Sequence, residues 1–238
     1  PGGMRVHAGS VILEPGLAEA DFREIAAEGV WLAKAGFGAV KSPFDYAPLV
    51  AAAKAAGMIT TCHTGGSSIP GSSAIRGEHL VAMQPHVSFH VNGGPTAVPD
   101  EDLRLIIEKT EAALQVCTAG NLRTTILVAE LARDLDVFDR FIIATDTPTG
   151  SGIMPLGMLY TITHCASFTD MPPERFLCAA TGSNAARPPT TSTARSRSPS
   201  PTRISSARRG SQPKRPPRST PSKISRARRS RRWRDRST

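Results

Sequence analysis

Short apolar runs alternate with amphipathic helical segments along the first 187 residues, and this alternation constrains the fold more than any other feature of the chain. The runs that predict strands are residues 4–9, 29–41, 58–66, 86–94, 113–120 and 140–150. Helices are predicted over residues 17–29, 44–57, 77–84, 99–112, 122–135, 154–168 and 172–181. Regular alternation of strands and helices is typical of parallel βαβ units, so we expect an α/β fold.

Several of the predicted strands end in a polar side chain that is followed by Gly or Pro. The segments are Lys41-Ser-Pro, His63-Thr-Gly-Gly, His90-Val-Asn-Gly-Gly and Asp146-Thr-Pro. A TIM barrel carries its catalytic groups at the carboxyl ends of different strands, whereas a doubly wound sheet usually carries a glycine-rich phosphate loop. The chain contains neither GxGxxG nor a Walker pattern. We therefore expect a TIM (β/α)8 barrel. Because about six strands are predicted, we expect it to be incomplete, with one or two N-terminal strands missing.

The composition changes abruptly near residue 187, and this change divides the chain into two predicted parts. Residues 188–238 carry 14 Arg and 2 Lys against 1 Asp, with Ile204, Ile224 and Trp233 as their only large apolar residues. The first 187 residues carry 13 Lys and Arg against 19 Asp and Glu, so the net charge of +9 comes from the tail. We predict a partial barrel over residues 1–187, with roughly strands 3–8, and a disordered Arg/Ser/Pro-rich tail over 188–238.

Two interpretations of this tail stay open. Its residue types are those that a shifted reading frame of a GC-rich gene produces, so a frameshift near residue 187 would explain why the hydrophobic periodicity stops there. Alternatively, "ARSRSPSP" and "RARRSRRWRDR" are typical of an RNA-binding tail that attracts phosphates in a salt-dependent way. A single aromatic residue offers little base stacking, so we expect only non-specific nucleic-acid binding through the tail.

Lys41, His63, His90 and Asp146 are the candidate metal-binding residues. Histidine and aspartate are good ligands for zinc, iron or manganese. A lysine is a poor ligand, but the carbamate that it forms with CO2 is an anion that can bridge two metal ions. Taken singly, each residue has an ordinary explanation as a structural histidine, a helix-capping aspartate or a solvated lysine. Their occurrence at successive predicted strand ends favours a shared site, because such ends converge in a barrel.

Longer motifs surround these residues and carry a family resemblance. They are "MRVHAGSVILEPGL", "GFGAVKSPFD", "HTGGSSIPGSS", "SFHVNGGPTAV", "IIATDTPTGSGIMPLGML" and "ATGSN". Together they resemble the amidohydrolase superfamily, and within it the enamidases, which hydrolyse cyclic enamides. The resemblance covers residues 4 to about 186. It implies a metal-bearing TIM barrel joined to a small β-sandwich built from both ends of the chain.

The resemblance also implies roles for individual residues. The family places a lysine, often carbamylated, on strand four, a histidine on each of strands five and six, and an aspartate on strand eight. Lys41 resembles the bridging lysine, with Lys34 on the same segment as the alternative. His63 and His90 resemble metal ligands, and Asp146 resembles the ligand that also acts as the catalytic base.

One family feature is missing from the sequence. The first strand of the family carries a His-x-His pair that holds the first metal ion, but no such pair occurs here, and His7 has no such partner. We expect the pair to lie upstream of Pro1. For the complete enzyme the resemblance implies two divalent metal ions per site (zinc, or iron or manganese), CO2 as a lysine carbamate, and a homo-oligomer.

These observations predict metal-dependent hydrolysis of the C–N bond of a small cyclic amide, with impaired activity in this chain. A non-catalytic remnant and a basic-tailed nucleic-acid-binding protein are the alternatives. For substrate binding we predict Gly65, Gly66, Asn92, Gly93 and Gly94, although glycines there also suit plain turns. Four cysteines without a CxxC pair suggest a reducing cytoplasm, and no apolar run approaches the length of a membrane helix.

Overall fold

The structure is a computed structural model that describes residues 9–93, 97–147 and 154–182. All of these residues lie in the first of the two units into which the chain divides, Pro1–Ser196. His7, Gly94 and the predicted tail over 188–238 lie outside the described residues. The predicted domain boundary at residue 187 therefore stays a prediction.

A parallel sheet of six strands forms the centre of the described part, and its strands lie side by side in chain order. The strands are β1 (Ser10–Ile12), β2 (Leu32–Ala35), β3 (Ile59–His63), β4 (Val87–Phe89), β5 (Ala113–Cys117) and β6 (Phe141–Ala144). Each strand is added beside the one before it, which is the order of a (β/α)8 barrel. A doubly wound sheet would reverse its strand order at a switch point, so the structure confirms the barrel-type α/β fold.

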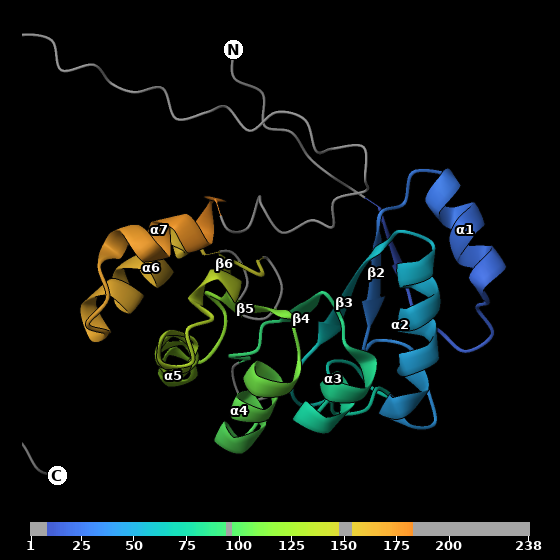
Figure 1. Cartoon of the computed structure of the whole chain (residues 1–238), viewed down its shortest axis with the longest axis horizontal. Coiled ribbons are helices and arrows are strands. Elements are labelled where there is room, and N and C mark those ends of the chain that lie inside the picture. The colour runs from blue at the N-terminus through green and yellow to red at the C-terminus, as the bar shows by residue number, and fades with distance from the viewer. Residues whose placement is uncertain (1–8, 94–96, 148–153, 183–238) are drawn as a thin grey trace, which may run out of the picture. The chain divides into compact units, whose positions relative to one another are not determined.

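Helices α1 to α5 connect successive strands and follow one another around the sheet, and α6 and α7 come after β6 (Figure 1). The helices are α1 (Glu19–Ala27), α2 (Tyr46–Ala55), α3 (Gly77–Met83), α4 (Asp100–Lys109), α5 (Leu122–Asp134), α6 (Gly157–Phe168) and α7 (Pro173–Ala180). Two 3-10 turns, η1 (Pro43–Asp45) and η2 (Phe138–Arg140), precede α2 and β6. Each of these α-helices lies within a range that the sequence predicts.

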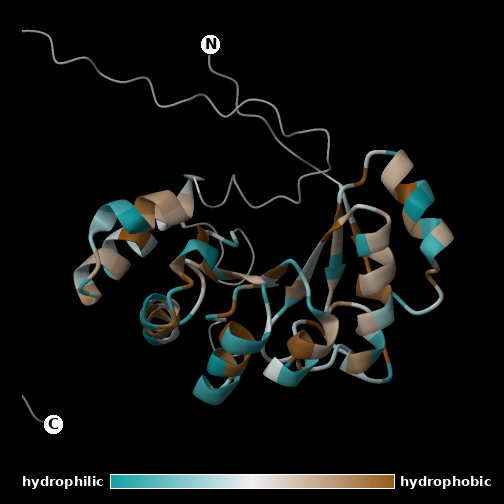
Figure 2. Ribbon diagram, viewed as in Figure 1, coloured by the Kyte–Doolittle hydropathy of each residue, from teal (hydrophilic) through white to brown (hydrophobic). Residues whose placement is uncertain are grey.

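Chemical signals at the helix ends explain where the helices begin. Helix α4 follows Pro99, carries three acidic residues in its first turn and ends at Lys109, which suits the helix dipole. Helix α5 is capped by Asn121, whose side-chain oxygen accepts a hydrogen bond from the backbone N–H of Thr124 at 3.1 Å. Helix α4 buries Leu103, Ile106 and Ile107 on one side and carries charged residues on the other, so it covers the sheet with its apolar side (Figure 2).

The pairing register divides the side chains of the sheet into two sets. Lys34 pairs with Thr61 and His63 pairs with Phe89, so these four side chains share one face of the sheet. Cys62 points to the other face, where it is fully buried in the hydrophobic core. Burial raises the pKa of its thiol to about 12, so Cys62 is a core residue whose thiol stays protonated.

All six strands differ in their bounds from the predicted runs; β3 to β6 are shorter parts of those runs, and β1 and β2 differ as follows. Strand β1 lies at Ser10–Ile12, just after the run that the sequence predicts, and β2 ends at Ala35. Gly36 has a φ of +97°, a left-handed conformation that ends the extended strand, so Lys41 lies in a loop and not at a strand end. Among the described residues, no helix has both the length and the apolar character that a membrane span requires.

Candidate active site

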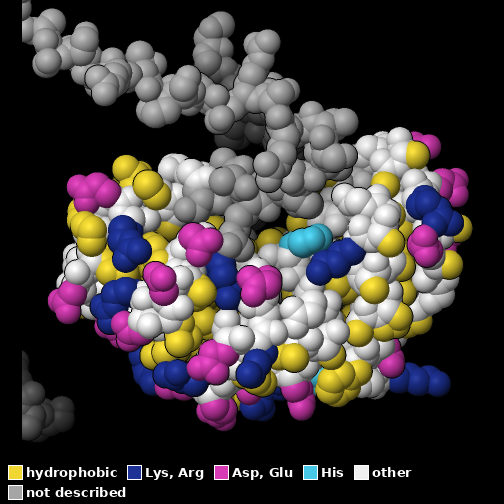
Figure 3. Space-filling model, in the orientation of Figure 1, with side chains coloured by type: hydrophobic (Ala, Val, Ile, Leu, Met, Phe, Trp, Pro, Cys, Tyr) yellow, Lys and Arg dark blue, Asp and Glu magenta, His cyan; other side chains and the backbone are white. Residues whose placement is uncertain are grey.

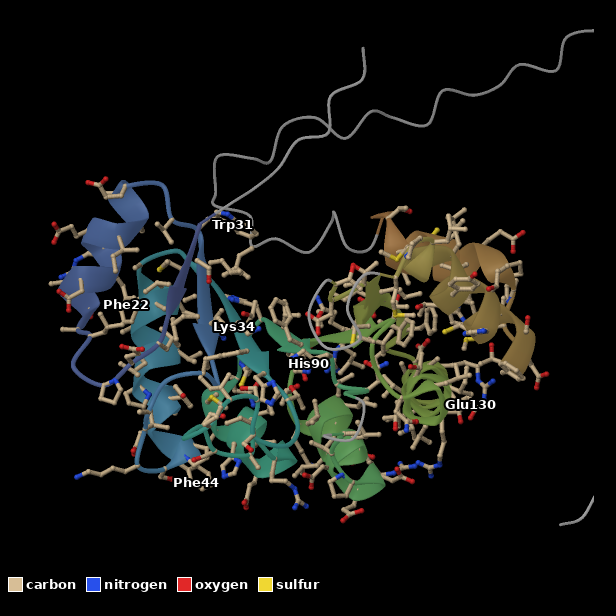
Figure 4. All side chains as sticks on the ribbon, turned by 180° about the vertical axis from the view of Figure 1, so that it is seen from behind. Phe22, Trp31, Lys34, Phe44, His90 and Glu130 are labelled. Carbon is tan, nitrogen blue, oxygen red and sulfur yellow. The ribbon has the colours of Figure 1, made fainter. Side chains whose placement is uncertain are left out.

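Two of the predicted site residues, His63 and His90, lie together near the carboxyl ends of the strands, and the charges of Lys34 and Asp146 act on both. His63 is the last residue of β3, His90 follows β4, and Asp146 lies just beyond β6. Lys34 comes from β2, on the same face of the sheet as His63. The charges of Lys34 and Asp146 both act on the pKa values of the two histidines, so the four groups are electrostatic neighbours. Figure 4 labels Lys34 and His90, which lie near one another at the sheet.

The two histidines form the geometric centre of the site. The distance between His63 Nδ1 and His90 Nε2 is 3.1 Å, and the ring centroids are 4.6 Å apart. His63 Nε2 lies 2.5 Å from the carbonyl oxygen of Gly66. Because a carbonyl oxygen can only accept, Nε2 carries the proton and donates it to Gly66, which leaves a lone pair on Nδ1 pointing toward His90.

Burial keeps both imidazoles neutral. It lowers the pKa of His63, and the positive charge of Lys34 lowers it further. Burial also lowers the pKa of His90, and the neighbouring His63 and Lys34 act in the same direction. The carboxylate of Asp146 opposes these effects without overcoming them. Neutral imidazole is the form that ligates a metal ion, so the pair is in the correct protonation state at neutral pH.

Two site residues have strained backbones. His90 has a φ of +36° and Asp146 a φ of +54°, both in the left-handed region that non-glycine residues seldom adopt. Such conformations cost of order 1–3 kcal/mol and cluster at functional sites, where the surrounding structure holds them. The strain identifies the ends of β4 and β6 as positions where the direction of a side chain matters.

Lys34 is the site residue for which the sequence offered only a weak signal. Its ammonium lies 4.4 Å from the ring centroid of Phe37 and 4.8 Å from that of Phe89. Burial lowers the pKa of Lys34, while the charge of Asp146 opposes that shift. The available signal was a charged lysine in an otherwise apolar strand, "LAKA".

The structure does not bring Lys41 to this group. Lys41 is exposed in the loop after β2, where it lines a hollow of about 410 Å³ with Pro15, Asp45 and Leu49, among others. The lysine whose charge acts on the two histidines is Lys34.

The predicted substrate-binding residues are engaged within the protein. The backbone N–H of Gly65 donates to the carbonyl of Ile75 at 2.9 Å, and that of Gly93 donates to His90 at 2.6 Å. These N–H groups serve turns and pairing in the described structure, and substrate binding by these residues stays a prediction. The carbonyl of Gly66 orients His63, as described above.

Asn92 has a structural role in the described site. Its side chain is fully buried, and its amide donates to the carbonyl of Cys117 at 2.9 Å and to the hydroxyl of Thr125 at 2.6 Å. Its oxygen accepts from the backbone N–H of Cys117 at 2.9 Å. The side chain thus ties the loop after β4 to β5 and α5.

The residues present fit a metal ion in part. Among the described residues, no group of three or more His, Cys, Asp or Glu side chains is arranged to hold a metal ion. The 3.1 Å between His63 Nδ1 and His90 Nε2 nevertheless suits two nitrogens that share one zinc ion at roughly 2.0–2.1 Å each. Many metal-bound histidines donate their other ring N–H to a backbone carbonyl that orients the ring, and Gly66 accepts from His63 in this way.

Comparison with known proteins agrees with the family resemblance of the motifs. Enamidase of Eubacterium barkeri is 41% identical over 187 residues, which are 78% of this chain and 48% of that protein. The crystal structure of enamidase, described as a new member of the amidohydrolase superfamily, matches with a TM-score of 0.72 and 40% identity over 77% of this chain and 48% of that one. The chain spans about half the length of these relatives. No protein-family model matches the chain. From its sequence and its fold together, the chain belongs to the amidohydrolase superfamily.

Proposed function

We propose that this chain carries the barrel portion of a metal-dependent hydrolase that opens a small cyclic amide. The name of the related protein, enamidase, supports a cyclic enamide or similar lactam as the substrate class. The observation that carries the proposal is the neutral histidine pair, with His63 Nδ1 and His90 Nε2 3.1 Å apart and the tautomer of His63 set by Gly66. The two nitrogens point toward one place between the rings, where a metal ion would replace the hydrogen-bonded proton that they share.

In this proposal His63 and His90 hold the metal ion through the two converging nitrogens. Asp146 is a further ligand, and Lys34 takes the bridging role that the motifs suggested for Lys41. A bound divalent metal polarises the substrate carbonyl and lowers the pKa of water toward about 7. The lowered pKa of Lys34 favours the neutral amine, which is the form that reacts with CO2 to give a carbamate.

The protein's own groups account for the remaining steps. Water adds to the amide carbonyl carbon, the C–N bond breaks and the ring nitrogen gains a proton. Asp146 accepts the proton of the attacking water on a carboxylate oxygen and delivers it to the leaving nitrogen. Phe37 and Phe89, which flank Lys34, supply apolar walls that limit the access of water.

Zinc binding tests the metal site directly. Zinc affinity of the 238-residue chain would be measured by titration calorimetry, together with His63→Ala, His90→Ala and the control His164→Ala. His164 is exposed on α6, and its ring stacks on Tyr160, away from the pair. We expect the first two variants to lose zinc affinity and the control to keep it. Equal affinity in all four proteins would contradict the proposal. Hydrolysis of a six-membered lactam by the zinc-loaded chain is the accompanying activity assay.

The choice of lysine is tested separately with ¹³C-labelled bicarbonate. A carbamate gives a resolved ¹³C NMR signal, which we expect to disappear in Lys34→Ala and to remain in Lys41→Ala. A signal that disappears only in Lys41→Ala would restore the assignment made from the motifs.

The tail gives a second candidate function, because residues 188–238 carry the positive charge of the chain. We propose that the tail is a separate segment from the barrel portion over 1–187 and binds nucleic acids without sequence preference. Filter binding of single-stranded RNA by the full chain should weaken steeply as salt increases. A chain truncated after residue 187 should lose this binding, and retention of binding would reject the assignment.

A further inference from the structure

Strand β5 lies between β4 and β6, the strands that lead to His90 and Asp146. The register of β4 with β5 continues to Phe89 and Gln115, so these two side chains share one face of the sheet. Phe89 in turn pairs with His63. Gln115 is therefore a polar residue in the middle of β5, on the face of the sheet that carries His63.

Gln115 holds the turn at His90 with both of its oxygen atoms. Its side-chain Oε1 accepts a hydrogen bond from the backbone N–H of His90 at 3.3 Å, and its backbone carbonyl accepts one from that of Val91 at 2.8 Å. Because a backbone N–H can only donate, the oxygen of the side-chain amide is the end that faces His90. The other end of the amide, the Nε2 donor, is therefore not used by this backbone.

The donor end of Gln115 is available to a ligand. Of the described residues, none accepts a hydrogen bond from its Nε2, and the side chain is partly exposed. Gln84 differs in this respect, since its Nε2 donates to the carbonyls of Val81 and Lys109, both at 2.9 Å. In Figure 3, a histidine side chain lies next to a lysine or arginine on the open surface near the middle of the described part, where a small ligand can approach.

The place of this donor suits the carbonyl oxygen of a bound amide. Gln115 is anchored beside His90 on one side. On the other side, burial raises the pKa of Cys117, two residues further along β5, and the charge of Asp146 raises it further, so Asp146 is near this strand. A neutral amide donor stabilises the negative charge that develops on a carbonyl oxygen when water adds to the carbon. A ring without an acceptor would leave the donor unpaired, so the donor favours carbonyl compounds.

We propose that Gln115 is a substrate-binding residue of this site, whose Oε1 stays on the N–H of His90 while its Nε2 donates to the carbonyl oxygen of a small cyclic amide. The inference rests on the proposed function, because it places the substrate beside the same histidine pair. It adds β5 to the strands that build the site and gives the substrate carbonyl a defined direction.

Nuclear magnetic resonance of the zinc-loaded 238-residue chain tests this contact, with δ-valerolactam, a six-membered lactam, as the probe. The two Nε2 proton signals of Gln115 are identified by their absence from the spectrum of Gln115→Met. We expect these signals to shift until they saturate as the lactam is added. The signals of Gln84 should stay in place, because its Nε2 already donates to Val81 and Lys109.

Two variants separate the donor from the anchor. Gln115→Glu keeps an oxygen for the N–H of His90 but has no donor, whereas Gln115→Met lacks both. We expect both variants to bind δ-valerolactam about tenfold more weakly than wild type, and Gln115→Glu to bind zinc at least as tightly as wild type. Gln84→Met is the matched control and should keep both affinities. Circular dichroism shows whether each variant is folded.

Several results would overturn the inference. It is wrong if the lactam leaves the Gln115 signals in place, whether or not other signals move, or if Gln115→Glu binds the lactam like wild type. It is equally wrong if Gln84→Met weakens lactam binding as much. Failure of the proposed function looks different: wild type would then bind no zinc, or His63→Ala would bind it as tightly as wild type, and this inference would be rejected with it.

Discussion

Replacing Gly36 by alanine tests how closely the end of β2 packs against the histidine site. A Cβ atom added at Gly36 would lie 2.6 Å from the Cβ of His63 and 3.4 Å from its backbone nitrogen. The φ of Gly36 is +97°, a conformation that L-residues rarely adopt. The substitution therefore combines backbone strain with a direct overlap on a proposed metal ligand.

Gly57→Ala separates the two effects. Gly57 has a φ of +82°, and nothing lies within 4 Å of an added Cβ. A non-glycine residue in the left-handed region costs roughly 1–2 kcal/mol, so Gly57→Ala should lose about that much unfolding free energy. Gly36→Ala should lose this and more, because His63 has to move by about 0.8 Å to reach an ordinary contact of 3.4 Å.

The assays are urea unfolding for stability and titration calorimetry for zinc. We expect Gly57→Ala to be destabilised with unchanged zinc affinity. Gly36→Ala should lose stability and also bind zinc about ten- to a hundredfold more weakly, as is typical when the support of a metal ligand is disturbed. If Gly36→Ala binds zinc as tightly as Gly57→Ala, the close packing of Gly36 on His63 does not position the ligand, and the reasoning fails.

Two further predictions concern stability. Asn92→Ala removes three buried hydrogen bonds to Cys117 and Thr125, at about 1 kcal/mol each. Urea unfolding should therefore show that the free energy of unfolding falls by about 3 kcal/mol. A fall below about 1 kcal/mol would reject the structural role of the side chain. His86 Nδ1 accepts the backbone N–H of Thr60 at 3.0 Å, and burial, followed by the charge of Lys54, lowers the pKa of His86 below its usual value of 6.5. Because the unfolded chain then binds more protons, stability should be fully present above pH 6.5 and fall as the pH drops from there toward the folded-state pKa. His86→Asn keeps a hydrogen-bond acceptor but does not titrate. The urea midpoints measured at about pH 7 and about pH 5 should therefore differ less in this variant than in wild type. If the two proteins show the same difference between the two pH values, this role for His86 is rejected.

Local patterns were sufficient to predict the elements and the strand order. Apolar periodicity and end signals such as Pro99 and Asn121 are properties of neighbouring residues, so the helices were predicted within a few residues. His63 was predicted at the end of a strand for the same reason, and the structure has it there. That His63 and His90 bind a metal ion stays a prediction.

The choice between Lys34 and Lys41 could not be made from local patterns. Both lie on one predicted strand, and which lysine faces the histidines depends on where that strand ends and how it pairs. Gly36 ends β2 early, and the register of Lys34 with Thr61 turns Lys34 toward the face of His63. A pairing register is a contact between distant segments, so it leaves no trace in the spacing of either segment.

The glycine-rich loops show the same limit. Glycines allow both a ligand-binding loop and an ordinary turn, and the sequence around Gly65 and Gly93 is compatible with either. Only the folded chain shows that their N–H groups already have partners in Ile75 and His90.

The sequence by itself determined that this protein builds a parallel α/β sheet of the barrel type. Its signals were the alternation of apolar runs with helical segments and the polar residues that follow the predicted strands. Those patterns reflect interactions within a few residues. Tertiary structure alone decided which lysine joins the histidines, which tautomer His63 adopts and which backbone amides are already bonded. The choice of lysine depends on the pairing of β2 with β3, which are distant in the chain. The tautomer of His63 and the amide partners depend on how the loops fold back, as in the contact of His63 with Gly66 and of Gly65 with Ile75.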